Sequence, residues 1–183
     1  MKNFVFLLTI SRVISGPFIF FFTVFIEIYL VALFIFIFAS LTDYYDGKLA
    51  RSFNVETALG ATLDPIADKI LILFSMFAIT LATHDSFIGL MSVFILSREF
   101  LVSALRELTA SSNNNAATKV TFLAKIKTSI QFLALFLFFY GLGMNDALII
   151  FIGKFFLFAA LLISFKTALQ YFQNTFFNDK GLK

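Results

Sequence analysis

The sequence predicts an all-α integral membrane protein, a bundle of about six transmembrane helices with both termini in the cytoplasm. Of its 183 residues, 60% are hydrophobic and only 14% are charged, and the mean hydropathy is +0.95. A soluble domain carries about 25% charged residues, so this chain lacks the side chains for a water-facing exterior. Its apolar residues also follow one another directly, as in FIFFFTVFIEIYL, whereas the strands of a membrane β-barrel alternate.

Six apolar segments account for the bundle, and no boundary divides them, so we expect a single membrane domain over residues 1–183. A helix needs about 20 apolar residues to cross the hydrocarbon core; the second segment is short by itself. The first segment continues past Arg12 without a small-residue cleavage site, so we expect a retained helix rather than a signal peptide. In chain order the expected helices cover residues 4–26, 28–42, 59–82, 87–105, 128–143 and 147–171.

The cations predict the orientation. Thirteen of the fourteen Lys and Arg residues lie at one set of helix ends, and Lys154 is the exception. The opposite connections are short and hold Glu27, His84, Asp85 and Asp146. The positive-inside rule then places the segments 43–58 and 106–127 in the cytoplasm together with both termini. We therefore expect a multi-pass protein of the cell inner (cytoplasmic) membrane.

Composition also excludes some classes of site. The chain has no cysteine, so it has neither a disulfide framework nor a thiolate metal site. The net charge is +3, but no basic run interleaved with aromatic residues accompanies it, so we expect no nucleic-acid partner. Membrane lipids are the expected surroundings.

Four of the seven aspartates fall within LTDYYDGKLARSFNVETALGATLDPIADKI, residues 41–70. On helices, Asp43 and Asp46 share a face, and so do Asp64 and Asp68. If the two helices are antiparallel neighbours joined near Asn54, both pairs point at one spot near the cytoplasmic boundary. Four carboxylates there repel one another unless cations lie between them, and hard divalent ions prefer oxygen ligands.

Aspartates also occur in EF-hand loops and as helix caps. An EF-hand loop needs oxygen ligands at alternate positions and a Glu at the twelfth, which this window lacks. A single aspartate at a helix end is usually a cap or a solvated residue, and this is our interpretation of Asp85, Asp146 and Asp179. The window is different because its four aspartates are spaced as two same-face pairs.

Written as a pattern, the window is D-x2-D-G-x2-A-R-x8-G-x3-D-x3-D. At every fixed position it resembles the signature of the CDP-alcohol phosphatidyltransferases. The resemblance implies that two divalent cations, Mg²⁺ or Mn²⁺, bind among Asp43, Asp46, Asp64 and Asp68 and hold the diphosphate of a CDP-linked lipid. It also implies that Asp68 takes the proton from an attacking hydroxyl, whose oxygen displaces CMP from phosphorus.

The same resemblance implies a nucleotide-lipid site. Gly47, Ala50 and Gly60 match positions where small side chains let the nucleotide approach two helices closely. Arg51 matches a residue that pairs with phosphate or orients an aspartate. Thr57 aligns with a hydroxyl residue that contacts the nucleotide in some relatives.

Two downstream segments bear on the acceptor alcohol. SREFLVSALRE (97–107) and AKIKTSIQ (124–131) resemble segments of the bacterial phosphatidylglycerophosphate synthases within this family. This resemblance implies CDP-diacylglycerol and glycerol 3-phosphate as substrates, and a possible homodimer because family members commonly form one. A phosphorylated acceptor needs cations, and the available ones are Arg98, Arg106, Lys125 and Lys127. The alternative for any one of them is anchoring to anionic headgroups. The last helix adds nothing specific to the resemblance.

Two alternatives remain beside this hypothesis. One is a sibling transferase that uses another phosphorylated alcohol, such as inositol phosphate. The other is a non-enzymatic divalent-metal transporter or sensor, which predicts acidic residues at several depths along a path. The clustered acids of this chain lie at one level.

Overall fold

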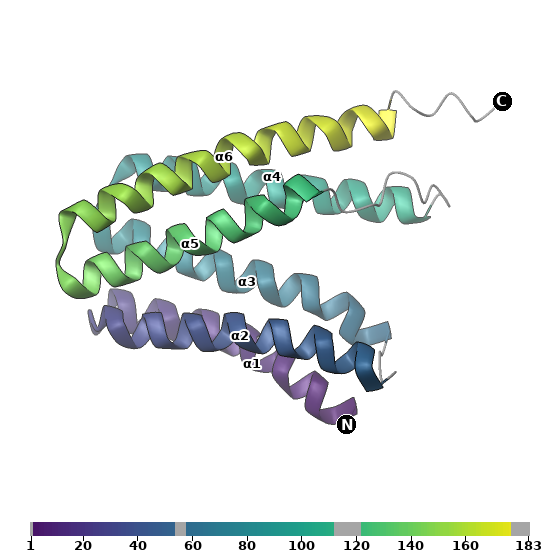
Figure 1. The fold of residues 1–183 in the computed structure, drawn as a ribbon, viewed down its shortest axis with the longest axis horizontal. Helices are drawn as coiled ribbons and strands as arrows, with labels where there is room; N and C mark the ends of the chain where they lie inside the picture. The colour runs from purple at the N-terminus through teal and green to yellow at the C-terminus, as the bar shows by residue number, and fades with distance from the viewer. Residues whose placement is uncertain (1, 54–57, 112–121, 177–183) are drawn as a thin grey trace. The chain divides into compact units, whose positions relative to one another are not determined.

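The computed structural model describes residues 2–53, 58–111 and 122–176, and these residues form α-helices with short connections after α1, α3 and α5 and with no strand among them (Figure 1). Side chains are described for residues 9–42, 63–107, 123 and 126–173. The six helices of this described part are α1 (Lys2–Val24), α2 (Tyr29–Phe53), α3 (Ala58–Thr83), α4 (Ser86–Ser111), α5 (Phe122–Met144) and α6 (Ala147–Phe176). The expected all-α fold is confirmed, and each expected apolar segment matches its own helix, except that residues 25, 26 and 28 lie in the turn after α1. The expected turn near Asn54 lies outside the described residues.

The helices have the length and composition of membrane spans. Within the described residues, α3, α4, α5 and α6 each contain a stretch long and apolar enough to cross a bilayer. The apolar stretches Thr9–Val24 of α1 and Tyr29–Thr42 of α2 are shorter. Both helices continue beyond these stretches, and α2 carries the polar sequence TDYYDGKLARSF as helix rather than loop. The chain is therefore a multi-pass membrane protein.

The helices form two compact units. The first unit comprises residues 1–86 and 135–150, and therefore contains α1, α2 and α3 with the end of α5 and the start of α6. In this unit α1 packs against both α2 and α3 (Figure 1). A Cβ added at Gly16 of α1 would lie 3.0 Å from the Phe74 ring and 3.4 Å from the carbonyl oxygen of Ile70, both on α3. A glycine at this position therefore permits the close approach of α1 to α3.

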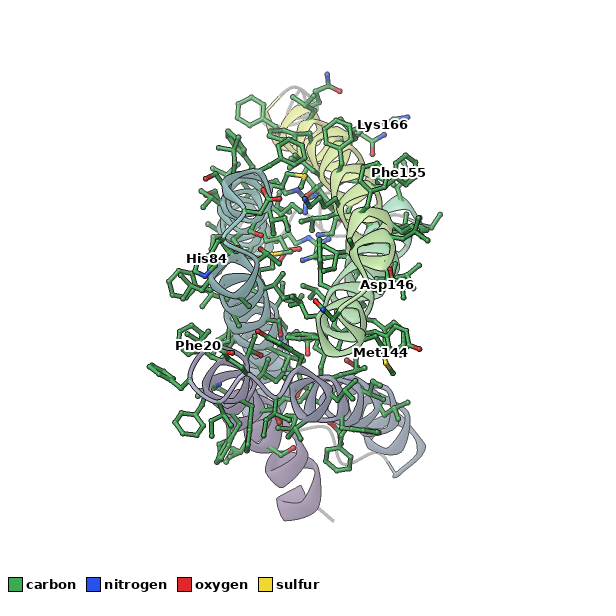
Figure 2. All side chains as sticks on the ribbon, turned by 90° about the vertical axis from the view of Figure 1, so that its left-hand side faces the viewer. Phe20, His84, Met144, Asp146, Phe155 and Lys166 are labelled. Atoms are coloured by element: carbon green, nitrogen blue, oxygen red, sulfur yellow. The ribbon has the colours of Figure 1, made fainter. Side chains whose placement is uncertain are left out.

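In two tight turns of the first unit, after α5 and after α3, backbone amides donate to carbonyls of the preceding helix. After α5, the amides of Asn145 and Asp146 donate to the carbonyls of Leu142 and Gly141, and Asn145 has a φ of 52°. These bonds form a Schellman motif, with asparagine in the left-handed position. Asp146, labelled in Figure 2, then accepts from the amides of Leu148 and Ile149, so the expected cap is confirmed there.

His84 occupies the same left-handed position at the end of α3 that Asn145 occupies at the end of α5. Its φ is 49°, and its amide donates to the carbonyl of Leu81. The turn after α1 places Glu27 at a φ of 59°. The short connections expected from the sequence are therefore present, and each one holds a polar residue in the left-handed region.

The second unit comprises residues 87–134 and 151–183, which are most of α4, the first part of α5 and most of α6. The rings of Phe94 on α4 and Phe165 on α6 lie 6.1 Å apart. Large hydrophobic side chains recur along α6 at spacings of three and four residues and are exposed: Phe151, Phe155, Phe158, Leu162, Phe165, Leu169 and Phe172. Phe155, labelled in Figure 2, is 68% exposed. A stripe of this kind suits contact with lipid.

Candidate active site

The aspartate motif lies on two helices of the first unit. Asp43, Asp46, Gly47, Ala50 and Arg51 belong to the C-terminal part of α2. Gly60, Asp64 and Asp68 belong to the N-terminal part of α3. The helical spacing that pairs the aspartates is therefore confirmed. Thr57 lies outside the described residues, and of the four aspartates only the side chains of Asp64 and Asp68 are described.

Asp64 and Asp68 face α1, where one arginine binds both of them. Arg12 donates from Nη2 to Oδ1 of Asp64 at 3.0 Å and from Nη1 to Oδ1 of Asp68 at 2.6 Å. The hydroxyl of Thr9 donates to the same Asp64 oxygen at 2.8 Å. Asp64 and Asp68 are one helical turn apart, so the two Nη atoms of one guanidinium reach both. The expectation that these two carboxylates share a face is confirmed.

Burial differs across this ion-pair cluster. The Arg12 side chain is 1% exposed, whereas the side chains of Asp64 and Asp68 are 39% and 38% exposed. Thr9 is buried as well. The arginine therefore binds the carboxylates from the protein interior, and both carboxylates keep an accessible side.

This donor set fits a divalent cation. Carboxylate oxygens are ligands that hard cations such as Mg²⁺ prefer, and each carboxylate accepts at two oxygens. The bonds from Arg12 and Thr9 to Asp64 both involve Oδ1, so they are compatible with a cation bound through Oδ2 of Asp64. No cluster of three or more potential metal ligands occurs among the described side chains, which do not include those of Asp43 and Asp46.

Arg12 and Thr9 are functional candidates that the sequence analysis missed. Arg12 was treated there only as one of the cations that set the orientation. A signal was present, because a charge inside an apolar run is costly and usually functional. The sequence did not indicate the partner, since that depends on which face of α1 meets α3.

The expected acceptor cations belong to the second unit, and one of them is in a buried ion pair. Lys127 Nζ lies 2.7 Å from Glu99 Oε1, and their side chains are 7% and 9% exposed. The pair joins α5 to α4. A buried cation needs such a counter-charge, so Glu99 neutralises much of the charge that Lys127 would offer a phosphate.

Arg98 and Arg106 are both held by α6. Arg98 Nη2 donates to the hydroxyl of Thr167, which itself donates to the carbonyl of Ser164 at 2.9 Å. Arg106 Nη2 donates to the hydroxyl of Tyr171, and its guanidinium carbon lies 4.6 Å from the centre of the Tyr171 ring. The two α6 residues are four apart and so lie on one face of the helix.

These contacts give the last helix a part in the candidate acceptor site. Its sequence adds nothing specific to the family resemblance, but α6 supplies the hydroxyls that bind both arginines. Arg98, Arg106 and Lys127 are thus brought into one unit with Glu99, and the side chain of Lys125 on α5 lies outside those described. Together, the four described side chains carry a formal net charge of +2.

Comparison with known proteins identifies the family of this chain. The profile of the family described as CDP-alcohol phosphatidyltransferase matches residues 3–167. A Wigglesworthia glossinidia brevipalpis protein named CDP-diacylglycerol–glycerol-3-phosphate 3-phosphatidyltransferase is 38% identical over 167 residues, 90% of each chain. The Escherichia coli K12 protein of the same name is 39% identical over 132 residues, which are 70% of this chain and 72% of that one. The chain belongs to the CDP-alcohol phosphatidyltransferase family.

Proposed function

We propose that this protein transfers the phosphatidyl group of CDP-diacylglycerol to sn-glycerol 3-phosphate, giving phosphatidylglycerophosphate and CMP. The observation that carries the proposal is the aspartate motif, whose helical spacing and paired Asp64 and Asp68 suit a diphosphate substrate held through cations. The names of the similar bacterial proteins support the choice of substrates. Family membership favours an enzyme over the metal transporter or sensor.

The donor site comprises the motif residues on α2 and α3. Members of this family use divalent metal ions, and we assign two of them, Mg²⁺ or Mn²⁺, to the motif aspartates. When bound, such ions neutralise charge on the diphosphate and on the leaving CMP. The residues assigned to hold the ions are Asp43, Asp46, Asp64 and Asp68. The residues assigned to the CDP-lipid are Gly47, Ala50, Arg51, Thr57 and Gly60.

Asp68 is the proposed general base. The acceptor hydroxyl gives its proton to the Asp68 carboxylate, and its oxygen forms a bond to the β-phosphorus. The bond between that phosphorus and the oxygen of CMP breaks, and CMP leaves with the electron pair. Arg12 fixes the Asp68 carboxylate by binding Oδ1, so one oxygen of the base has a defined direction.

The acceptor phosphate is assigned to Arg98, Arg106, Lys125 and Lys127. A phosphate monoester is close to a dianion at neutral pH, which matches the net charge of +2 carried by the described members of the group with Glu99. The arginines are better suited than Lys127, because a planar guanidinium binds phosphate oxygens in pairs and Lys127 is already paired with Glu99. Uncharged glycerol or inositol has no anionic group for these cations to bind, whereas inositol phosphate has one.

The setting of the reaction follows from the distribution of cations. We place the protein as a single catalytic domain, residues 1–183, in the cytoplasmic membrane, with both termini and the site on the cytoplasmic side. That side offers both the water-soluble acceptor and a route for CMP to leave. A homodimer is a further part of this proposal.

The test is a transfer assay on the purified protein with CDP-diacylglycerol and a panel of acceptors. Glycerol 3-phosphate, glycerol, inositol and inositol phosphate are compared by CMP release and by the lipid product. We expect product from glycerol 3-phosphate alone, and loss of activity with a chelator that added Mg²⁺ or Mn²⁺ restores. Equal reaction with glycerol or inositol would refute the acceptor, and preference for inositol phosphate would select the sibling activity.

A further inference from the structure

Arg12 offsets part of the negative charge of the candidate metal site from inside the protein. Its guanidinium binds two carboxylates on successive turns of α3, at 3.0 and 2.6 Å, and its side chain is 1% exposed. A soluble cation can reach Asp64 and Asp68 only from their exposed side, away from Arg12. Both carboxylates thus contact the guanidinium of Arg12 on their interior side and are accessible on the opposite side.

Packing alone does not explain an arginine at this position. Removing a guanidinium from water carries a large desolvation cost, and a hydrophobic side chain of similar volume packs helices at least as well. The hydroxyl of Thr9 adds a second donor to the Asp64 oxygen that Arg12 already binds. The cluster thus places two donors on Oδ1 of Asp64 and Arg12 Nη1 on Oδ1 of Asp68, which fixes the directions of the carboxylates.

We propose that Arg12 is a positioning residue and a built-in counter-cation of the aspartate site. It holds Asp64 and Asp68 in place whether or not a divalent ion is bound, and its charge lowers the affinity of the site for that ion. This inference rests on the proposed function, because it requires the aspartates to bind divalent cations. It concerns only the part of the site formed by α1 and α3.

The two roles of Arg12 predict opposite changes in the variant Arg12→Gln. Loss of the positive charge removes a repulsion, so Mn²⁺ should bind about tenfold more tightly, even if the dielectric constant is that of water. Loss of the guanidinium removes the bond that fixes Oδ1 of Asp68, so kcat at saturating Mn²⁺ and substrates should fall about 100-fold, the lower range for a general base. A merely structural residue would weaken Mn²⁺ binding and turnover together.

The variant Arg12→Lys separates charge from geometry. Lysine keeps the positive charge but presents a single nitrogen, which cannot reproduce the two-pronged contact with both carboxylates. The Mn²⁺ dissociation constant should therefore stay within about threefold of the unmutated value, while kcat lies between those of the unmutated protein and Arg12→Gln.

The experiment measures Mn²⁺ binding in the purified, detergent-solubilised protein without substrates, from the electron paramagnetic resonance signal of free Mn²⁺. The same preparations are assayed for kcat. Lys166→Gln removes an exposed positive charge from α6 (Figure 2) and should leave the dissociation constant unchanged. Asp64→Asn should weaken binding, which ties the signal to this site.

The outcomes are distinguishable. If the unmutated protein binds no Mn²⁺, the proposed metal site fails and this inference fails with it. If it binds Mn²⁺ but Arg12→Gln binds no more tightly, only the inference is refuted. If Arg12→Gln does not fold, Arg12→Lys decides: unchanged affinity with lower kcat supports the inference, and weakened affinity or unchanged kcat overturns it.

Discussion

The buried pair between Lys127 and Glu99 gives the sharpest test of what the acceptor cations do. We consider Lys127→Met, which keeps an unbranched side chain one atom shorter than lysine and removes its charge. Glu99 would then be a buried carboxylate, 9% exposed and without the ammonium that lies 2.7 Å away in the unmutated protein. Removing one partner of a buried ion pair costs about 3–5 kcal/mol. For a chain of this length, that loss lowers the midpoint of thermal unfolding by on the order of 10 °C.

The double variant Lys127→Met with Glu99→Leu should recover most of this stability. Replacing both charges by hydrophobic side chains of similar size is often neutral or stabilising, because no charge is then desolvated. If Lys127 also contacts the acceptor phosphate, the double variant should still have a raised KM for glycerol 3-phosphate. Its KM for CDP-diacylglycerol should change much less.

The assay combines thermal unfolding of the purified protein in one detergent with steady-state kinetics for both substrates. Glu99→Gln serves as the reciprocal control, because it leaves Lys127 without its counter-charge and should be similarly destabilised. A fully stable Lys127→Met would refute the account of the pair. A double variant that recovers both stability and the KM for glycerol 3-phosphate would remove Lys127 from the acceptor site and leave it a structural role.

Three further predictions concern the base, the arginines and the orientation. Asp68→Asn should reduce turnover by at least 100-fold while CDP-diacylglycerol binding is largely kept, and near-normal turnover would exclude Asp68 as the base. Arg106→Ala should lower kcat/KM for glycerol 3-phosphate by roughly 30- to 1,000-fold, and Tyr171→Phe by less, because the ring contact stays; equal loss toward both substrates would argue against an acceptor role. In intact cells, a cysteine at Ser86 should react with a membrane-impermeant thiol reagent and one at Lys180 should not, and the reverse pattern would invert the proposed orientation.

The sequence predicted the helices well because length and composition determine them. Apolar runs near 20 residues satisfy their backbone groups in lipid as helices, and the six expected segments match the six helices of the described residues to within two residues at each end of a segment that overruns its helix. The apolar segment 28–42 covers only part of α2, which extends to Phe53. This extension agrees with the expectation that Asp43 and Asp46 lie on a helix.

The partners of the site residues could not be predicted, and the reason is physical. In a soluble helix the apolar stripe marks the inner face, but a membrane helix is apolar toward lipid and toward its neighbours alike. The sequence pattern around Arg12 therefore did not indicate which face of α1 meets α3, nor that Arg12 contacts Asp64. For the same reason the sequence did not indicate that Thr167 and Tyr171 contact Arg98 and Arg106.

The self-capped turn after α5 also bears on how the chain enters the membrane. Asn145 and Asp146 connect α5 to α6, and their amides and the Asp146 carboxylate are engaged in capping bonds. Because the connection is only two residues long, one helix cannot cross the bilayer while the other remains in water. We therefore expect α5 and α6 to insert as one hairpin. Only one formal charge, that of Asp146, must then be carried across in this turn. Lengthening the turn with polar residues would raise the barrier to insertion, so the yield of inserted protein should fall before the activity of the inserted molecules does.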